Sequence, residues 1–277
     1  MNLQDIQLFN LILISICLTS ILASFITIVL CFIPNLIENL SRKLLMCFSL
    51  NNIGRCIMFI IGLNSKGYLC LFLGFMKNVF LISNVLWSFF IAKGLVQSLK
   101  NREEINPKEF YYWLLGSYLA IPAIESLAFT TNSYDSITCD GITKDLMGVI
   151  WRTLLVYLPC TALTISILFM YRNIYKYLNQ EYAVNKFEFL IDRGLIYSGQ
   201  FIIIFLPLPF IRLGLIYFQN STTEALMLAE NVIIYMQGII LLILTLMRSG
   251  IREKICCKFN NKNRFLSEGE YINDILN

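Results

Sequence analysis

The sequence predicts an all-α protein, a bundle of seven transmembrane helices with its N-terminus outside and a short amphipathic helix after the seventh. Three observations lead to this fold class. Of the 277 residues, 57% are hydrophobic and 14% are charged, whereas soluble domains carry about 25% charged residues. The mean hydropathy is +0.66, and the apolar residues form segments long enough to cross a bilayer. Lys and Arg concentrate in alternate connections between those segments.

Seven segments of about 20 or more mostly apolar residues are bounded by polar connections. The predicted spans are residues 8–33, 44–63, 68–97, 110–130, 146–170, 195–218 and 225–247. The first is expected to be a spanning helix and not a cleaved signal, because its apolar core exceeds the roughly 7–15 residues of a signal peptide. With no internal repeat, residues 1–259 are expected to form one membrane domain and residues 260–277 a cytoplasmic tail.

The basic residues orient the bundle. With the N-terminus outside, the inner connections and tail hold 15 of the 22 Lys and Arg residues, and the outer connections hold Lys66 and Lys144. Positive charge stays on the cytoplasmic side of membrane proteins, which favours this orientation. The triplet Asn220-Ser221-Thr222 lies in the predicted third outer connection. Asn220 is therefore a candidate glycosylation site, although such triplets also occur by chance.

The stretch "SGIREKICCKF" follows the seventh span and places Ile251, Ile255 and Phe259 one helical turn apart with basic residues between them. This pattern predicts an amphipathic helix over residues 250–259, lying on the inner leaflet. Cys256 and Cys257 are candidate palmitoylation sites there; the alternative is that both are ordinary cysteines.

Cysteines also mark the outer side. Five of the nine are expected to pack as small apolar groups inside spans: Cys17, Cys31, Cys47, Cys56 and Cys160. Cys70 begins the third span, and Cys139 lies in the second outer connection, about residues 131–145. A disulfide between them would fix that connection over the bundle. The alternative is that two cysteines fall on this side by chance.

Charged residues inside the spans predict a ligand site. Five of them come near the outer ends of their spans, and alternating helix direction brings them to one depth: Lys77, Glu125, Arg152, Arg212 and Glu230. Charge in a bilayer is costly, so these groups should face the bundle interior. Three cations against two anions favour a small anionic or zwitterionic ligand entering from outside. The alternative is a set of scattered structural ion pairs.

Other polar residues in the spans are given structural roles. Arg55 is expected near the midplane of the second span, and Asn51, Asn52 and Asn84 are expected to hydrogen-bond between helices. Lys93 should extend toward the inner surface.

Prolines interrupt three of the spans. Pro207 and Pro209 precede Arg212 in "FLPLPFIRLGLIYF" and are candidates for a conformational switch. Prolines are also frequent in membrane helices without that role, and the same alternative applies to Pro122 and Pro159.

Several classes of function are disfavoured. The chain has no histidine, which removes imidazole catalysis and imidazole metal ligation. It has no Gly-x-Ser-x-Gly and no paired aspartates in a span, so we expect no enzyme activity, no cofactor and no metal. A net charge of +4 gives no reason to expect nucleic acid as a partner.

Residues 36–259 resemble the cyclic-AMP-receptor-like (class E) family of G-protein-coupled receptors. The resemblance is carried by "KLLMCFSLNNIGRC", "CLFLGFMKNVFLISNVLW", "FYYWLLGSYLAIP", "WRTLLVYLP" and "FIRLGLIYF". Arg152, Pro159 and Arg212 match family positions, and Cys70 and Cys139 stand where these receptors link the third helix to the second outer loop. The resemblance implies a plasma-membrane receptor for a small extracellular ligand, such as a cyclic nucleotide or another small anion. Its partners would be a heterotrimeric G protein and membrane lipids.

The sequence departs from that family in several places. The seventh span ends in "LILTLMRSG" without Asn-Pro, and Cys56 stands where an acidic residue is expected. Lys77 and Glu230 have no family counterpart. A small-molecule transporter or channel is the alternative function, because charges within spans also suit ion pathways. The odd span count and the missing inverted repeat favour the receptor.

Overall fold

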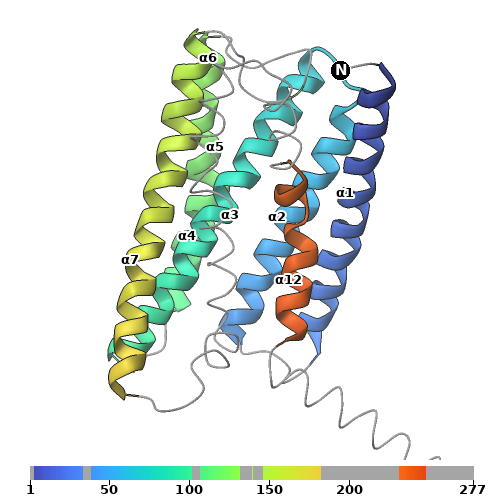
Figure 1. Ribbon diagram of the computed structural model, residues 1–277. Helices are drawn as coiled ribbons and strands as arrows, with labels where there is room; N and C mark the ends of the chain where they lie inside the picture. The colour runs from blue at the N-terminus through green and yellow to red at the C-terminus, as the bar shows by residue number, and fades with distance from the viewer. Residues whose placement is uncertain are drawn as a thin grey trace, which may run out of the picture.

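The described residues of a computed structural model are 3–33, 39–101, 107–131, 139, 146–181 and 231–247. Within these ranges the chain is helical and contains no strand. The elements, in chain order, are α1 (Leu3–Phe32), α2 (Asn39–Gly62), α3 (Tyr68–Asn101), α4 (Pro107–Leu115), η1 (Gly116–Ala120), α5 (Ile121–Glu125), η2 (Ser126–Thr131), α6 (Leu146–Trp151), η3 (Arg152–Tyr157), α7 (Leu158–Glu181) and α12 (Gln237–Leu246). They run side by side as a bundle (Figure 1).

Five helices are long and apolar enough to cross a membrane. They cover Leu8–Phe32, Arg42–Gly62, Tyr68–Gly94, Lys108–Thr131 and Met147–Ile174. These segments confirm the first five predicted apolar spans. The shorter apolar helix α12 lies within the predicted seventh span, while the predicted span 195–218 lies outside the described residues.

Two helices continue past the ends of the apolar spans predicted from the sequence. The third predicted span ended at residue 97, but α3 continues to Asn101. The fifth ended at residue 170, but α7 continues to Glu181. Both extensions are polar, and a helix can continue into water because its backbone hydrogen bonds are internal. Hydropathy locates the apolar part of a helix and not its end.

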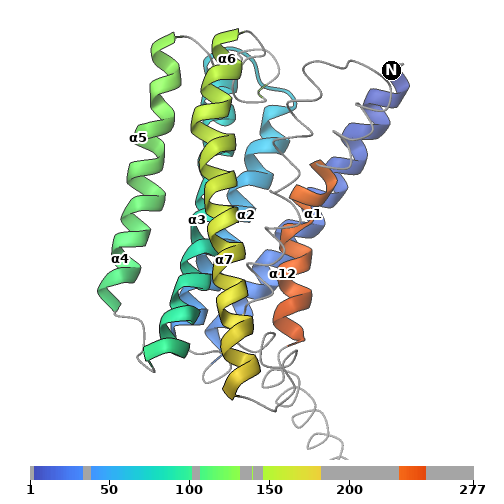
Figure 2. The same ribbon diagram turned by 60° about the vertical axis from the view of Figure 1, so that its left-hand side comes forward.

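Helix α3 is the centre of the described bundle. It packs against α2 on one side, and against α5, η1 and α7 on the other. Helix α1 packs against α2 and α12, so α12 closes the bundle beside the two helices at the start of the chain. Figures 1 and 2 both show α12 lying alongside α1, far from it in sequence.

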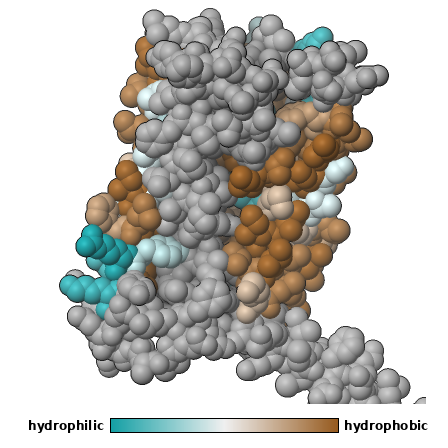
Figure 3. Space-filling view, in the orientation of Figure 1, coloured by the Kyte–Doolittle hydropathy of each residue, from teal (hydrophilic) through white to brown (hydrophobic). Residues whose placement is uncertain are grey.

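The bundle is apolar outside and partly polar inside. Leu18, Leu22 and Phe25 of α1 are exposed, whereas Ser20 and Ser24 of the same helix are buried. Figure 3 shows hydrophobic side chains over the described surface, with hydrophilic ones gathered near the lower end of α7. A soluble bundle has the opposite arrangement. In lipid, small polar residues inside allow close helix packing and hydrogen bonding, so this pattern supports a membrane protein.

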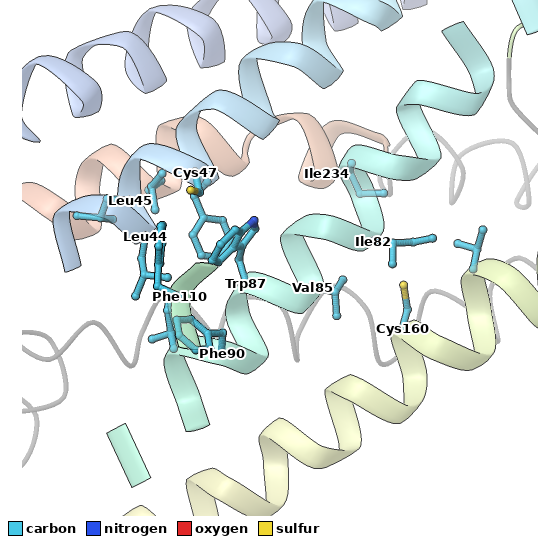
Figure 4. Packing of buried hydrophobic residues seen from close by; sticks show 14 of the residues in the cluster. Leu44, Leu45, Cys47, Ile82, Val85, Trp87, Phe90, Phe110, Cys160 and Ile234 are labelled. Carbon is cyan, nitrogen blue, oxygen red and sulfur yellow. The ribbon is translucent and has the colours of Figure 1, made fainter. Parts of the chain in front are cut away.

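Aromatic residues fill the core at one end of α3. Trp87 is fully buried, with its ring centroid 5.5 Å from that of Phe110 and 6.1 Å from that of Phe90. Figure 4 shows these rings grouped where α2, α3 and α4 meet. Nearby, the Lys93 amine lies 3.2 Å from a Glu109 carboxylate oxygen and 5.5 Å from the centroid of the Trp113 ring. Lys93 therefore does more than extend to the surface, because it joins α3 to α4.

Two π-helices, η1 and η3, interrupt the fourth and fifth spans, in which the sequence analysis had noted Pro122 and Pro159. Each ends two residues before a proline: η1 at Ala120 before Pro122, and η3 at Tyr157 before Pro159. A proline lacks the N–H for the bond one turn back, and its ring crowds that carbonyl. Widening the preceding turn relieves the crowding. π-Turns are also frequent at functional sites, and η3 begins with Arg152.

Candidate functional site

One end of the bundle is closed by the contact between Cys70 and Cys139. Their sulfur atoms lie 1.96 Å apart and their Cα atoms 4.7 Å apart. Cys139 also approaches the α2–α3 turn, since a Cβ built on Gly62 would lie 3.4 Å from the Cys139 Cβ. The second predicted outer connection thus reaches the start of α3 at this residue. We call this the disulfide end, which is the upper end in Figure 1.

Three predicted ligand-binding residues lie at a similar distance from the disulfide end. Lys77 lies nine residues after the start of α3 at Tyr68. Glu125 lies six residues before the end of η2 at Thr131, and Arg152 six residues after the start of α6. At about 1.5 Å per residue these separations are about 9–14 Å. Each separation is counted along its own helix, so the common depth of these three residues stays a prediction.

The environments of the three residues differ. Glu125 is buried with 1% of its surface exposed, whereas Lys77 and Arg152 are half-buried. All three take part in a bonding or electrostatic interaction, so none is an isolated charge. The helices that carry them are close: α5 packs on α3, and the Trp151 indole N–H donates a 2.8 Å hydrogen bond to the Thr131 hydroxyl between α6 and η2.

The other predicted site residues lie outside the described part of the chain. They are Arg212 and Glu230 of the charged layer, the prolines Pro207 and Pro209, the glycosylation candidate Asn220, and the palmitoylation candidates Cys256 and Cys257. The predicted amphipathic helix 250–259 and the tail 260–277 also lie outside it.

The structure adds a fourth charged residue at this depth, on the opposite side of α3. Arg55 lies seven residues before the end of α2 at Gly62, or about 10 Å along the helix. Only 2% of its surface is exposed. Its Nη2 donates a hydrogen bond to the carbonyl oxygen of Ile234, and its Cζ lies 5.3 Å from the centroid of the Tyr235 ring.

Arg55 contacts the chain where its last described helix is broken. Residues 231–235 are helical, Met236 forms a turn, and α12 begins at Gln237. In a continuous helix the Gly238 N–H would bond to the Ile234 carbonyl. Here it donates to the Ser20 hydroxyl at 3.1 Å instead, and Arg55 takes the freed carbonyl. Side chains from α1 and α2 thus satisfy both backbone groups released by the break.

The same break is tied to α1 and α2 by Asn52. Its side-chain amide donates to the hydroxyls of Ser20 and Ser24, both at 2.9 Å. This confirms that Asn52 hydrogen-bonds between helices. Gly238 must be small here, because a Cβ would lie 2.5 Å from the Asn52 amide nitrogen and 2.5 Å from the Ser20 carbonyl oxygen. We refer to Ser20, Ser24, Asn52, Arg55, Gln237 and Gly238 as the Arg55 cluster.

Hydrogen bonding in the Arg55 cluster is incomplete within the described part of the chain. Nε and Nη1 of Arg55, Oδ1 of Asn52 and both amide atoms of Gln237 are buried and have no partner there. Buried polar groups in proteins are almost always hydrogen-bonded to protein, water or ions. These unpaired donors and acceptors could therefore hydrogen-bond to a polar ligand or ion.

A second polar group lies between α2, α3 and η1. The Tyr118 hydroxyl donates to the Asn51 side-chain oxygen at 2.7 Å, and the Ser83 hydroxyl donates to the Ser117 carbonyl at 3.0 Å. Asn51 thereby also confirms its predicted role between helices. Asn84 is buried, but its Oδ1 has no hydrogen-bond partner in the described residues.

Sequence reasoning missed the Arg55 cluster, although part of its signal was readable. Ser20 and Ser24 are four residues apart in "LTSILASF", and small residues at that spacing mark close helix contacts in membranes. Arg55 and Asn52 are three residues apart and share a face of α2. The break at Met236 has no proline to signal it. Its cause lies in side chains from other helices.

Comparison with known proteins places the chain in no family. No protein-family model matches the sequence, and a search of curated proteins finds no match.

Proposed function

We propose that the chain is a seven-span cell-surface receptor that senses a small anionic or zwitterionic extracellular ligand and signals through a heterotrimeric G protein. The N-terminus lies outside the plasma membrane, and the basic inner connections and tail face the cytosol. The resemblance of residues 36–259 to class E receptors supports this function, as does the asymmetric placement of 15 basic residues.

The observation that carries the proposal is the set of charges below the disulfide end. Lys77, Glu125 and Arg152 come from α3, α5 and η3 at a similar distance from that end. Charged groups within membrane spans are costly to insert and are typical of functional sites. A guanidinium offers paired N–H donors to a carboxylate or phosphate.

Activation needs the ligand to bind one arrangement of the helices better than another. The fifth span has a suitable structure, because η3 separates α6 at the disulfide end from the long helix α7. A change in the π-turn at Arg152 would re-aim α7, whose far end extends to Glu181. In this proposal the fifth and sixth spans carry the signal, and Pro207 and Pro209 form the corresponding joint of the sixth.

The test is ligand-stimulated nucleotide exchange on a co-expressed heterotrimeric G protein, screened with cyclic nucleotides and other small anions. Arg152→Gln should raise the half-maximal ligand concentration at least tenfold, because a charge-assisted hydrogen bond contributes about 1.5–3 kcal/mol. Lys66→Gln, in the exposed α2–α3 turn, is the matched control and should leave the response unchanged. Uptake of the ligand into cells without nucleotide exchange on the G protein would support the alternative function, a transporter.

A further inference from the structure

We propose that Arg55 binds a small monovalent anion, of the size of chloride, inside the bundle between α1, α2 and the break before α12. The proposal rests on the geometry of the Arg55 cluster and does not depend on the receptor function. The anion would neutralise a buried charge and stabilise the broken helix.

The first step is the missing counter-charge. Arg55 has 2% of its surface exposed, and no carboxylate of the described residues lies within ion-pair distance of it. Its one hydrogen bond goes to a neutral carbonyl, that of Ile234. The Tyr235 ring provides a cation–π contact at 5.3 Å, which partly offsets the charge but cannot neutralise it. A buried guanidinium without a counter-ion is strongly unfavourable.

The second step is the position of the described acidic side chains. Glu109 pairs with Lys93, and Glu125 lies on α5, on the opposite side of α3 from Arg55. Neither carboxylate is therefore placed to neutralise the Arg55 charge.

The third step is the geometry of the open donors. Neither Nε nor Nη1 of Arg55 has a hydrogen-bond partner in the described residues. Because the Nε–H and Nη1–H groups point to different sides of the guanidinium, an anion would accept a hydrogen bond from one of them and a water from the other. Both amide atoms of Gln237 and Oδ1 of Asn52 are also open among the described residues, so water around the anion would find donors and acceptors. A monovalent anion would match the single positive charge of Arg55.

The experiment uses the full-length protein purified in detergent, with thermal unfolding measured in sodium chloride, bromide and gluconate at matched ionic strength. We expect the unfolding temperature to be about 2–4 °C higher in chloride or bromide than in gluconate, since a bound ion stabilises the folded state. Arg55→Gln should lose this difference. The control Lys93→Gln removes a cation that already has a carboxylate partner, Glu109, and should keep it.

A second measurement covers the case in which Arg55→Gln does not fold. Wild-type protein should broaden the chlorine nuclear magnetic resonance line, and bromide but not gluconate should reverse the broadening. Absence of excess broadening, or equal unfolding temperatures in the three salts, would overturn the proposal. A third outcome would also overturn the proposal: the unfolding temperature of Glu230→Gln depends on chloride while that of the wild type does not. The counter-ion of Arg55 in the wild type would then be the Glu230 carboxylate.

Discussion

At the scale of single residues, Gly238 is where the packing allows least change. A Cβ at this position would lie 2.5 Å from both the Asn52 amide nitrogen and the Ser20 carbonyl oxygen. Real Cβ contacts are longer, so α12 would have to move away from α1 or the Asn52 bonds would have to break. Both responses affect the hydrogen bonds that stabilise the helix break.

Gly238→Ala should therefore lower the free energy of unfolding by about 1–3 kcal/mol, the usual cost of overpacking. Thermal unfolding in detergent measures the effect. Gly116→Ala is the matched control, because a Cβ there would meet only a Leu86 methyl at 4.0 Å. Equal unfolding temperatures for the two variants would contradict the close packing of α12 against α1 at Gly238.

Asn52 and Ser24 should be energetically coupled. Either single substitution already breaks the hydrogen bond between the two side chains, so the double variant Asn52→Ala/Ser24→Ala should cost less than the sum of the singles. Coupling of about 0.5–1.5 kcal/mol is expected, as for other bonds between membrane helices. Ser15→Ala is the control, because the exposed Ser15 hydroxyl bonds only to the Leu11 carbonyl of its own helix. Additive effects of Asn52 and Ser24 would argue against the bond.

At the scale of elements, α3 is positioned from both ends. Cys139 lies at its start, and the Lys93–Glu109 pair joins its other end to α4. The ion pair is about one-third exposed on both sides, so it contributes little, about 0–1 kcal/mol. The disulfide should contribute more to stability, since it joins Cys139 to the start of α3 by a covalent bond.

Cys70→Ala and Cys139→Ala should each lower the unfolding temperature, and the double variant should be no worse than either single variant, because one bond is lost in all three. The free energy of unfolding should fall by less than the roughly 2–5 kcal/mol typical of small secreted domains. Membrane-inserted helices gain less conformational freedom on unfolding, so removing the disulfide matters less. Cys47→Ala, a buried cysteine with no disulfide, is the control. A reducing agent should destabilise the wild type and leave the double variant unchanged; sensitivity of the double variant would contradict the assignment.

At the scale of the whole molecule, the first five spans were predictable because lipid imposes a simple rule on composition. Any helix that crosses the bilayer must be apolar for about 20 residues, and that property is visible without a structure. The polar ends at Asn101 and Glu181 were not predictable by this rule, because helix formation in water depends on other interactions. Pro122 and Pro159 marked the interrupted spans, but not the π-turns that precede them.

The candidate site was predictable only in part for a related reason. Helix direction and residue number alone predict a common depth for Lys77, Glu125 and Arg152. The sequence placed Arg55 near the midplane but named no partner for it, because that partner is a backbone carbonyl, that of Ile234, far away in sequence. In the broken segment itself the one local signal is Gly238, and the side chains that bond the freed backbone groups come from α1 and α2. Contacts between segments far apart in sequence become visible only in the three-dimensional structure.

Orientation is the remaining property of the whole molecule, and the basic residues make it testable. The distribution of Lys and Arg, fifteen in the predicted inner segments and two in the predicted outer ones, favours an N-terminus outside and a C-terminus inside. An epitope tag before Met1 should be detected on intact cells, and one after Asn277 only after permeabilisation. Glycosidase treatment should change the mobility of the wild type and not of Asn220→Gln, whereas Asn39→Gln should behave like the wild type, because its triplet lies on the inner side. Detection of both tags on intact cells would mean an even number of spans, and the charged layer would then have to be reassigned between the two faces of the membrane.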